Sequence, residues 1–198
     1  LISAAAIEGA KQLKVIGRAG AGVDTIDVDA ATAKGIAVMN APDGNTLAAA
    51  EHAISLLFSL ARHVPRADAG MKAGQWPKAG LTGFELEGKR LGVIGLGRIG
   101  STVARKAQGI GMDVAAFDPF LPASAAGKGS VSLKTLDELL AWADIITLHI
   151  PRTKDTTNLI GETQMRTMKK GAYLVNAARG GLIDEDALLR LLDARHLA

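Results

Sequence analysis

Three glycines near the middle of the chain have the spacing of a phosphate-binding loop. They follow the apolar run Leu91–Ile94 in the pattern G-x-G-x-x-G, at Gly95, Gly97 and Gly100. The first glycine permits a tight turn, the second lets the backbone approach a pyrophosphate, and the third lets a helix pack closely on the preceding strand. We expect that helix to begin near Arg98, so that the unpaired N–H groups at its start face the phosphates.

An acidic residue follows at the distance typical of dinucleotide-binding folds. Asp118 follows a second apolar run, Val114–Phe117, and lies 18 residues after Gly100. Its carboxylate can accept hydrogen bonds from a pair of ribose hydroxyls and would repel a 2′-phosphate, and no arginine follows in residues 119–121. The pattern therefore predicts dinucleotide binding and favours NAD over NADP. The alternative is that Asp118 only begins the turn at Pro119.

A single arginine is a candidate for binding and polarising a substrate. Arg179 follows the apolar run Ala172–Val175 in the sequence Asn176-Ala-Ala-Arg-Gly-Gly181. Open α/β sheets bind their ligands at the carboxyl ends of strands, where this arginine is expected to lie. Its planar guanidinium can bind a carboxylate through two hydrogen bonds and can stabilise an alkoxide beside a nicotinamide ring. The alternative is a surface arginine in a glycine turn.

A second strand followed by glycines lies near the start of the chain. Lys14-Val-Ile-Gly is followed by Arg18, Gly20 and Gly22, and no helix begins directly after them. We interpret these glycines as exposing backbone N–H groups toward a small anion, with Arg18 nearby. The alternative is a permissive turn that carries a solvated arginine.

Short runs rich in Val and Ile alternate with helical segments, which predicts an α/β fold with a parallel sheet. The expected strands are Leu13–Ile16, Ile36–Met39, Leu91–Ile94, Val114–Phe117, Ile145–Leu148 and Ala172–Val175.

The longest helical pattern covers about residues 46–71, and Pro65 is expected to kink or end its main part. The residues on its apolar face are Leu47, Ala50, Ile54, Leu57, Phe58 and Ala61. The turn cluster Asn40–Asn45 before it predicts a junction between a domain at residues 1–41 and another at 42–198. Thr135-Leu-Asp-Glu138 has the pattern of a capping box at a helix start.

Composition excludes several classes of function. The 198 residues contain no cysteine, which removes disulfides, thiolate nucleophiles and cysteine-bound metals, and we predict no metal site. The net charge of +3 comes from scattered Lys and Arg, so nucleic-acid binding is not expected. No apolar run is long enough to span a membrane, and we expect a cytoplasmic protein. Because the chain starts at Leu1 rather than Met, we expect an internal segment of a longer protein.

Taken together, the motifs resemble the D-isomer-specific 2-hydroxyacid dehydrogenases along essentially the whole chain. They are Gly17-Arg-Ala-Gly-x-Gly-Val-Asp, the glycine loop with Asp118, His149-Ile-Pro151, and Val175-Asn-Ala-Ala-Arg-Gly-Gly-Leu-Ile-Asp-Glu. The resemblance implies a Rossmann-type doubly wound parallel sheet with part of a second, flavodoxin-like substrate domain. It also implies NAD-linked hydride transfer at C2 of a 2-hydroxy or 2-keto acid, with D-3-phosphoglycerate as the nearest substrate, and a homodimer or higher homo-oligomer.

The resemblance also implies roles for individual residues. Arg179 would be the catalytic, substrate-binding arginine. Cofactor would be bound by Gly95, Gly97, Arg98, Ile99, Gly100 and Asp118, and its nicotinamide side would be lined by Ile150, Pro151, Ala177 and Ala178. The substrate side would be Arg18, Gly20, Ala21, Gly22 and Asn45. Ala21 stands where the family often has Thr, so only a backbone contact to cofactor is expected there.

The family's proton-relay Glu and His would lie beyond Ala198, and none of the four histidines present is a convincing substitute. We therefore expect this segment to bind NAD and to turn over poorly or not at all. Two other readings stay open. One is another member of the family, such as a glyoxylate/hydroxypyruvate reductase. The other is a noncatalytic NAD-sensing protein of the corepressor type.

Overall fold

The computed structural model describes residues 1–76, 78–121 and 131–198. These residues form two compact units, Leu1–Thr46 and Leu47–Ala198, and each is described by itself. The boundary between the units lies a few residues after residue 41, where the sequence places the domain junction.

The first unit is a small α/β layer. Its strands β1 (Val15–Arg18) and β2 (Ala37–Asn40) are parallel, with Val15 opposite Ala37. Helices α1 (Ala4–Gly9) and α2 (Val28–Ala33) accompany them. The core of this unit consists of five buried aliphatic residues: Ile7, Ile16, Ile26, Ala31 and Ile36.

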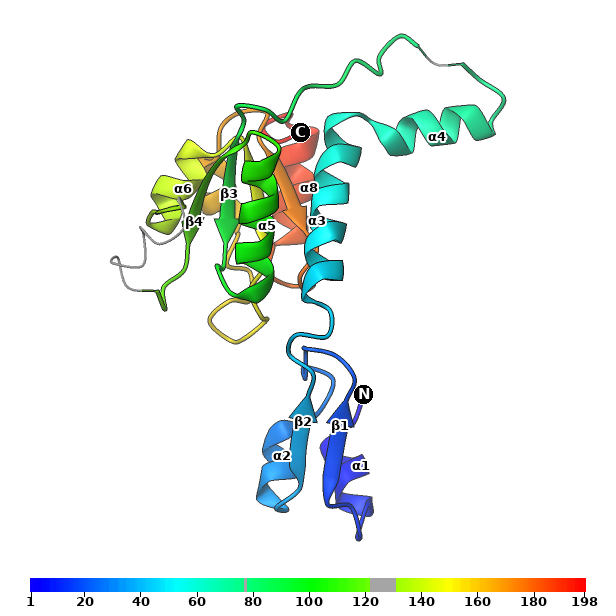
Figure 1. The fold of residues 1–198 in the computed structure, drawn as a ribbon, viewed down its shortest axis with the longest axis vertical. Helices are drawn as coiled ribbons and strands as arrows, with labels where there is room; N and C mark the ends of the chain where they lie inside the picture. Colours follow the sequence, from blue (N-terminus) through cyan, green and yellow to red (C-terminus); the bar gives the residue numbers. More distant parts are fainter. Residues whose placement is uncertain (77, 122–130) are drawn as a thin grey trace. The chain divides into compact units, whose positions relative to one another are not determined.

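The second unit is built on a five-stranded parallel sheet in the order β5-β4-β3-β6-β7 (Figure 1). The strands are β3 (Arg90–Ile94), β4 (Asp113–Phe117), β5 (Ser132–Leu133), β6 (Ile145–Leu148) and β7 (Tyr173–Asn176). The chain builds outward from β3 to β5 in one direction and then from β6 to β7 in the other. This order confirms the predicted Rossmann-type sheet and places the reversal between β3 and β6.

Helices cover both faces of this sheet (Figure 1). Buried residues of α3 (Thr46–Ala61) and α5 (Arg98–Gly109) pack with Leu91 and Val93 on one face. On the other face, Ile94 packs with α6 (Leu136–Trp142), α7 (Glu162–Thr167) and α8 (Glu185–Asp193). Successive side chains of β3 thus alternate between two apolar layers, as a strand buried on both faces requires.

The helical pattern at 46–71 forms two helices, α3 and α4 (Val64–Lys72). His63 takes a left-handed conformation with φ of 53°, and Pro65 lies in the first turn of α4, where a missing N–H costs no helical hydrogen bond. The predicted apolar face was wrong at Leu47 and Phe58, which are 60% and 43% exposed. Ala53 is buried instead, because the small residues of α3 face the sheet.

The predicted capping box is present at the start of α6. The Thr135 hydroxyl accepts from the Glu138 N–H at 3.3 Å, and the Glu138 carboxylate accepts from the Thr135 N–H at 2.9 Å. None of the described helices combines the length and apolar character needed to cross a bilayer.

Candidate functional site

The first and third glycines of the loop after β3 are required by space. Gly95 has φ of 89°, and a Cβ on it would lie 2.5 Å from the Ile150 Cγ2 and 2.8 Å from the His149 carbonyl oxygen. A Cβ on Gly100 would collide with the Gly95 carbonyl oxygen. The Gly95 N–H donates to the Phe117 carbonyl at 2.8 Å, which holds the loop at the end of the sheet. These two glycines therefore let β3, β6 and α5 approach one another closely.

Gly97 faces open space at the start of α5. It is the residue before the first helical turn, no side chain caps that turn, and nothing lies within 4 Å of the position of its missing Cβ. The first N–H groups of a helix have no partner within the helix. The start of α5, at Arg98 and Ile99, thus provides a backbone cradle that fits a pyrophosphate.

The carboxylate of Asp118 is fixed by two backbone hydrogen bonds. Its Oδ2 accepts from the Leu96 N–H at 2.9 Å, and its Oδ1 accepts from the Phe120 N–H at 3.0 Å. The bond to Phe120 forms the turn at Pro119 that the alternative interpretation of Asp118 predicted. The bond to Leu96 joins the same carboxylate to the glycine loop. Each carboxylate oxygen can accept more than one hydrogen bond, so capacity remains for two ribose hydroxyls.

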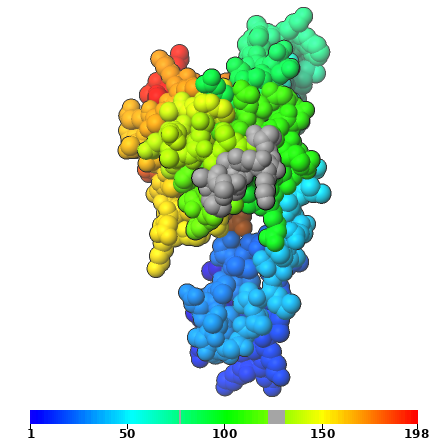
Figure 2. Space-filling view, turned by 60° about the vertical axis from the view of Figure 1, so that its left-hand side comes forward, coloured from blue at the N-terminus to red at the C-terminus, as the bar shows by residue number. Residues whose placement is uncertain are grey.

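The turn after β6 lies against the glycine loop. The His149 N–H donates to the Ile94 carbonyl at 2.8 Å, and its Nε2 lies 3.0 Å from the hydroxyl of Thr147, which is fully buried. Burial lowers the pKa of His149 to about 4, so its ring is neutral at neutral pH. Pro151 and the residues after it are exposed, and Figure 2 shows this segment, in yellow, standing out from the surface.

Asn176 closes the loop that carries Arg179 after β7. Its Oδ1 accepts from the N–H groups of Ala178 and Arg179 at 3.1 and 3.4 Å, and its Nδ2 donates to the Arg179 carbonyl at 2.8 Å. The guanidinium of Arg179 donates to the Ala178 carbonyl at 2.8 Å. This loop holds the half-buried arginine, with Ala177 and Ala178, at the end of β7.

Sequence reasoning missed Thr147 and Asn176. Asn176 carries a usable signal, since an Asn side chain readily bonds the backbone two and three residues further on. Thr147 carries a weaker signal: side chains two apart along a strand point to the same face, but His149 lies just after β6 ends.

In the first unit, one loop brings four predicted substrate residues together. The Arg18 Nε donates to the Gly22 carbonyl at 3.3 Å, and the Gly20 N–H donates to the Arg18 carbonyl at 2.9 Å. The Ala21 carbonyl accepts from the Asn40 side chain at 2.8 Å. Asn45 lies in a separate turn before α3. Ala21 is thus the one predicted cofactor residue that lies in the first unit rather than the second.

The predicted residues of the second unit share one edge of the sheet. The glycine loop follows β3, Asp118 follows β4, Ile150 and Pro151 follow β6, and Arg179 follows β7. All these strands are parallel, so the loops lie at their carboxyl ends and flank the reversal between β3 and β6. That reversal is where open α/β sheets bind ligands.

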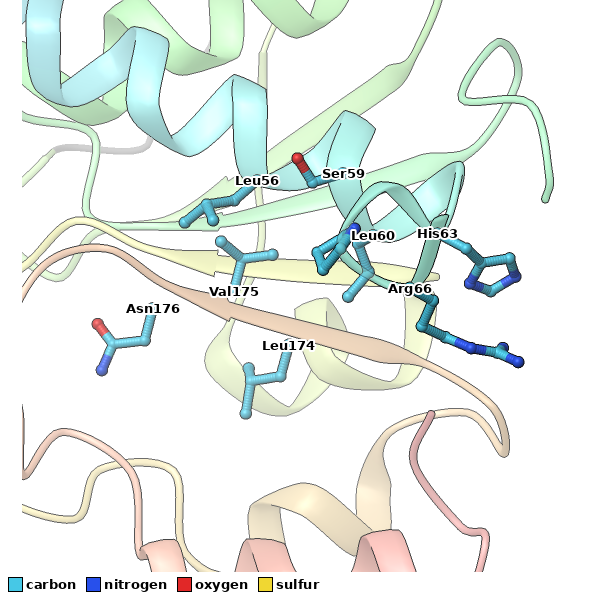
Figure 3. Close-up of a pocket in the computed structure, with 9 residues that line it drawn as sticks. Leu56, Ser59, Leu60, His63, Arg66, Leu174, Val175 and Asn176 are labelled. Carbon is cyan, nitrogen blue, oxygen red and sulfur yellow. The ribbon is translucent and has the colours of Figure 1, made fainter. Parts of the chain in front are cut away.

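A cavity of about 390 Å³ lies elsewhere, between β7 and the helices α3 and α4 (Figure 3). Leu56 and Leu60 line it on one side and Leu174 and Val175 on the other. Its walls contain none of the residues predicted for the site, although Asn176, which holds the Arg179 loop, also lines it. The candidate site is therefore the polar sheet edge and not this apolar cavity.

Comparison with known proteins gives one family match and many relatives. The family model described as D-isomer specific 2-hydroxyacid dehydrogenase, NAD binding domain, matches residues 54–198. The chain is 50% identical to the D-3-phosphoglycerate dehydrogenase of Archaeoglobus fulgidus over 197 residues, which cover 100% of this chain and 37% of that protein. It spans only about a third of the length of such curated relatives.

Solved structures agree with the fold. The D-lactate dehydrogenase from Aquifex aeolicus complexed with NAD and lactic acid matches with a TM-score of 0.88 and 34% identity, covering 99% of this chain and 59% of that one. A glyoxylate reductase from Paecilomyes thermophila matches with a TM-score of 0.85 and 38% identity, covering 93% of this chain and 56% of that one.

Proposed function

Because the chain belongs to the D-isomer specific 2-hydroxyacid dehydrogenase family, we propose that it is the NAD-binding part of an enzyme that oxidises D-3-phosphoglycerate to 3-phosphohydroxypyruvate. This reaction is the first step of serine biosynthesis. The support for this substrate is that a relative named for it is 50% identical along the whole chain.

The observation that carries the proposal is the convergence of three functions at one sheet edge. The start of α5 fits a pyrophosphate, Asp118 presents acceptors for ribose hydroxyls, and Arg179 presents a cation for the substrate. NAD, when bound, accepts the hydride that leaves C2. The guanidinium of Arg179 would hold the substrate carboxylate and stabilise charge on the C2 oxygen during the transfer.

The loop Arg18–Gly22 of the first unit is a separate candidate anion site. Arg18 supplies a cation, and the glycines on either side of Ala21 leave the backbone open to a small anion. A phosphate is an anion that such a loop could recognise.

Oxidation also requires a base for the hydroxyl proton as the hydride leaves. His149 is the histidine of the chain that follows a strand of the five-stranded sheet at this edge. Its ring is buried against Thr147, and its lowered pKa makes it a poor proton acceptor at neutral pH. We therefore expect the 198-residue chain to bind NAD without appreciable turnover.

Calorimetric titration with NADH tests the cofactor site. Micromolar binding is expected for the wild-type chain, with a loss of at least tenfold in Asp118→Ala. Asp113→Ala is the matched control, because Asp113 is an exposed carboxylate at the opposite end of the same strand. Equal loss in both variants, or no binding to folded wild-type chain, would contradict the proposal.

A second candidate is reduction of glyoxylate or hydroxypyruvate, which the 38% identity to a glyoxylate reductase favours. Steady-state kinetics on the full-length enzyme that contains this chain separates the two. A higher kcat/KM for 3-phosphohydroxypyruvate than for glyoxylate supports the first proposal, and the reverse order supports the second.

We also propose a cytoplasmic homodimer that uses α3, α4 and the segment after α4. Phe58, Val64, Met71 and Trp76 expose large apolar surfaces there, and Trp76 is 78% exposed, so it is not packed into its own unit. Figure 1 shows α4 extending away from the five-stranded sheet. Sedimentation equilibrium is expected to give a dimer for the wild type and a monomer for Trp76→Ser.

A further inference from the structure

Two threonines after β6 form a compact hydroxyl cluster on the exposed turn at Pro151. The Thr156 hydroxyl donates to the Pro151 carbonyl at 2.8 Å and accepts from the Thr153 N–H at 2.7 Å. The two hydroxyl oxygens lie 3.1 Å apart. Because Thr156 has a single hydroxyl proton and gives it to Pro151, the Thr153 hydroxyl is the donor between them. We call this pair the threonine clasp.

The same segment is attached to the loop that carries Arg179. Two residues after the clasp, the Asn158 N–H donates to the Gly181 carbonyl at 2.8 Å, with Asn158 in the left-handed region at φ of 51°. On the other side of the clasp, the Arg152 guanidinium lies against Gly181, its Cζ 3.1 Å from where a Cβ would be. Both ends of the turn therefore contact a residue that is two positions from Arg179.

These bonds join two loops beyond the ends of β6 and β7, next to a short backbone pairing further along the chain. In that pairing the Ile160 N–H donates to the Leu182 carbonyl at 3.1 Å, and the Asp184 N–H donates to the Ile160 carbonyl at 3.0 Å. β6 and β7 pair only as far as Leu148 and Asn176. The exposed residues 151–155 beyond that point have few buried contacts to hold them. The clasp fixes the Pro151 carbonyl to the segment that Asn158 ties to the Arg179 loop.

We propose that Thr156, supported by Thr153, is a positioning residue that fixes the Pro151 turn and couples it to the Arg179 loop in the cofactor-bound site. The proposal rests on the proposed function for its ligand, NAD. Thr156 holds the Pro151 carbonyl directly, and Asn158, two residues further on, makes the bond to Gly181.

The first test needs no ligand. In the 198-residue chain, Thr156→Val leaves the Thr153 N–H and the Pro151 carbonyl without their partner and keeps nearly the same volume. Amide hydrogen exchange is expected to speed up at least fivefold at Asn158 and Arg179. The matched control is Thr167→Val, which also removes an exposed threonine hydroxyl bonded to a backbone carbonyl, that of Thr163 on α7 at 3.1 Å.

The second test adds NADH. Thr156→Val is expected to weaken NADH binding about tenfold with a melting temperature equal to that of Thr167→Val, and Thr156→Ser, which keeps the hydroxyl, is expected to restore it. If Thr156→Val lowers the melting temperature more than Thr167→Val does, Thr153→Val is used instead. That variant is expected to weaken NADH binding about threefold.

The outcomes separate the two proposals. Unchanged exchange at Asn158 and Arg179, or NADH binding that Thr156→Ser does not restore, overturns the positioning role. A wild-type chain that fails to bind NADH overturns the proposed function, and the exchange rates still decide whether the clasp couples the loops.

Discussion

The carboxylate of Asp118, at the end of β4, accepts a 2.9 Å hydrogen bond from the backbone N–H of Leu96, inside the glycine loop that follows β3. The acceptor for a ribose and the cradle for a pyrophosphate are thus fixed relative to each other by a bond within the protein. Such preorganisation lowers the entropic cost of ordering the site when a ligand binds.

Asp118→Asn is expected to change the choice of cofactor. The substitution removes the negative charge that would repel a 2′-phosphate and keeps the size of the side chain. The ratio of the NADPH and NADH dissociation constants should fall at least tenfold, about 1.4 kcal/mol, in calorimetric titrations of the chain. Asp113→Asn, on the same strand, should leave the ratio unchanged. A constant ratio in Asp118→Asn would show that charge at this position does not select the cofactor.

Gly100→Ala is expected to destabilise the second unit by about 1–3 kcal/mol, because the added methyl group would collide with the Gly95 carbonyl. Gly109→Ala, at the end of the same helix, meets nothing within 4 Å and should raise stability by up to about 1 kcal/mol. Urea denaturation of the two variants measures both free energies of unfolding. Equal midpoints would mean that β3 and α5 do not need their close approach.

Stability is expected to fall in mild acid because of His149. The pKa of His149 is about 4 in the folded chain, compared with 6.5 for an ordinary histidine, as in the unfolded chain. Between these two pH values the unfolded chain therefore binds a proton that the folded chain does not. Its contribution is therefore complete above pH 6.5 and is lost as the pH falls toward 4, by about 3 kcal/mol in total. The denaturation midpoint should depend less on pH between pH 7 and 4 in His149→Gln than in the wild type. His52→Gln, at an exposed site on α3, is the matched control for the loss of an imidazole.

The sheet and the glycine loop could be predicted from the sequence because their signals are local. The run from Leu91 to Gly100 contains most of the strand, the turn and the helix start, and Asp118 directly follows the next strand. The short strand β5 has too few residues to show a period and was not predicted.

Other features depend on contacts that no local pattern records. Phe58 fits a helical apolar period, yet it is exposed because the alanines of α3 lie against the sheet. The spacing of Thr153 and Thr156 alone does not predict the hydrogen bond from Thr156 to the Pro151 carbonyl, because that bond depends on how the turn folds. Arg179 could be named from its motif, whereas the Asn176 side chain that holds its loop became evident only in three dimensions.

The reversal of strand order between β3 and β6 has a thermodynamic consequence. Among the described strands, the two halves of the sheet, β3-β4-β5 and β6-β7, are joined by strand pairing only between β3 and β6. A dinucleotide bound across the reversal would contact loops of both halves and would act as a noncovalent cross-link between them. Through linkage, NADH at one hundred times its dissociation constant would add about 2.7 kcal/mol to the free energy of unfolding. Melting of the two halves would then become more tightly coupled as the cofactor concentration rises.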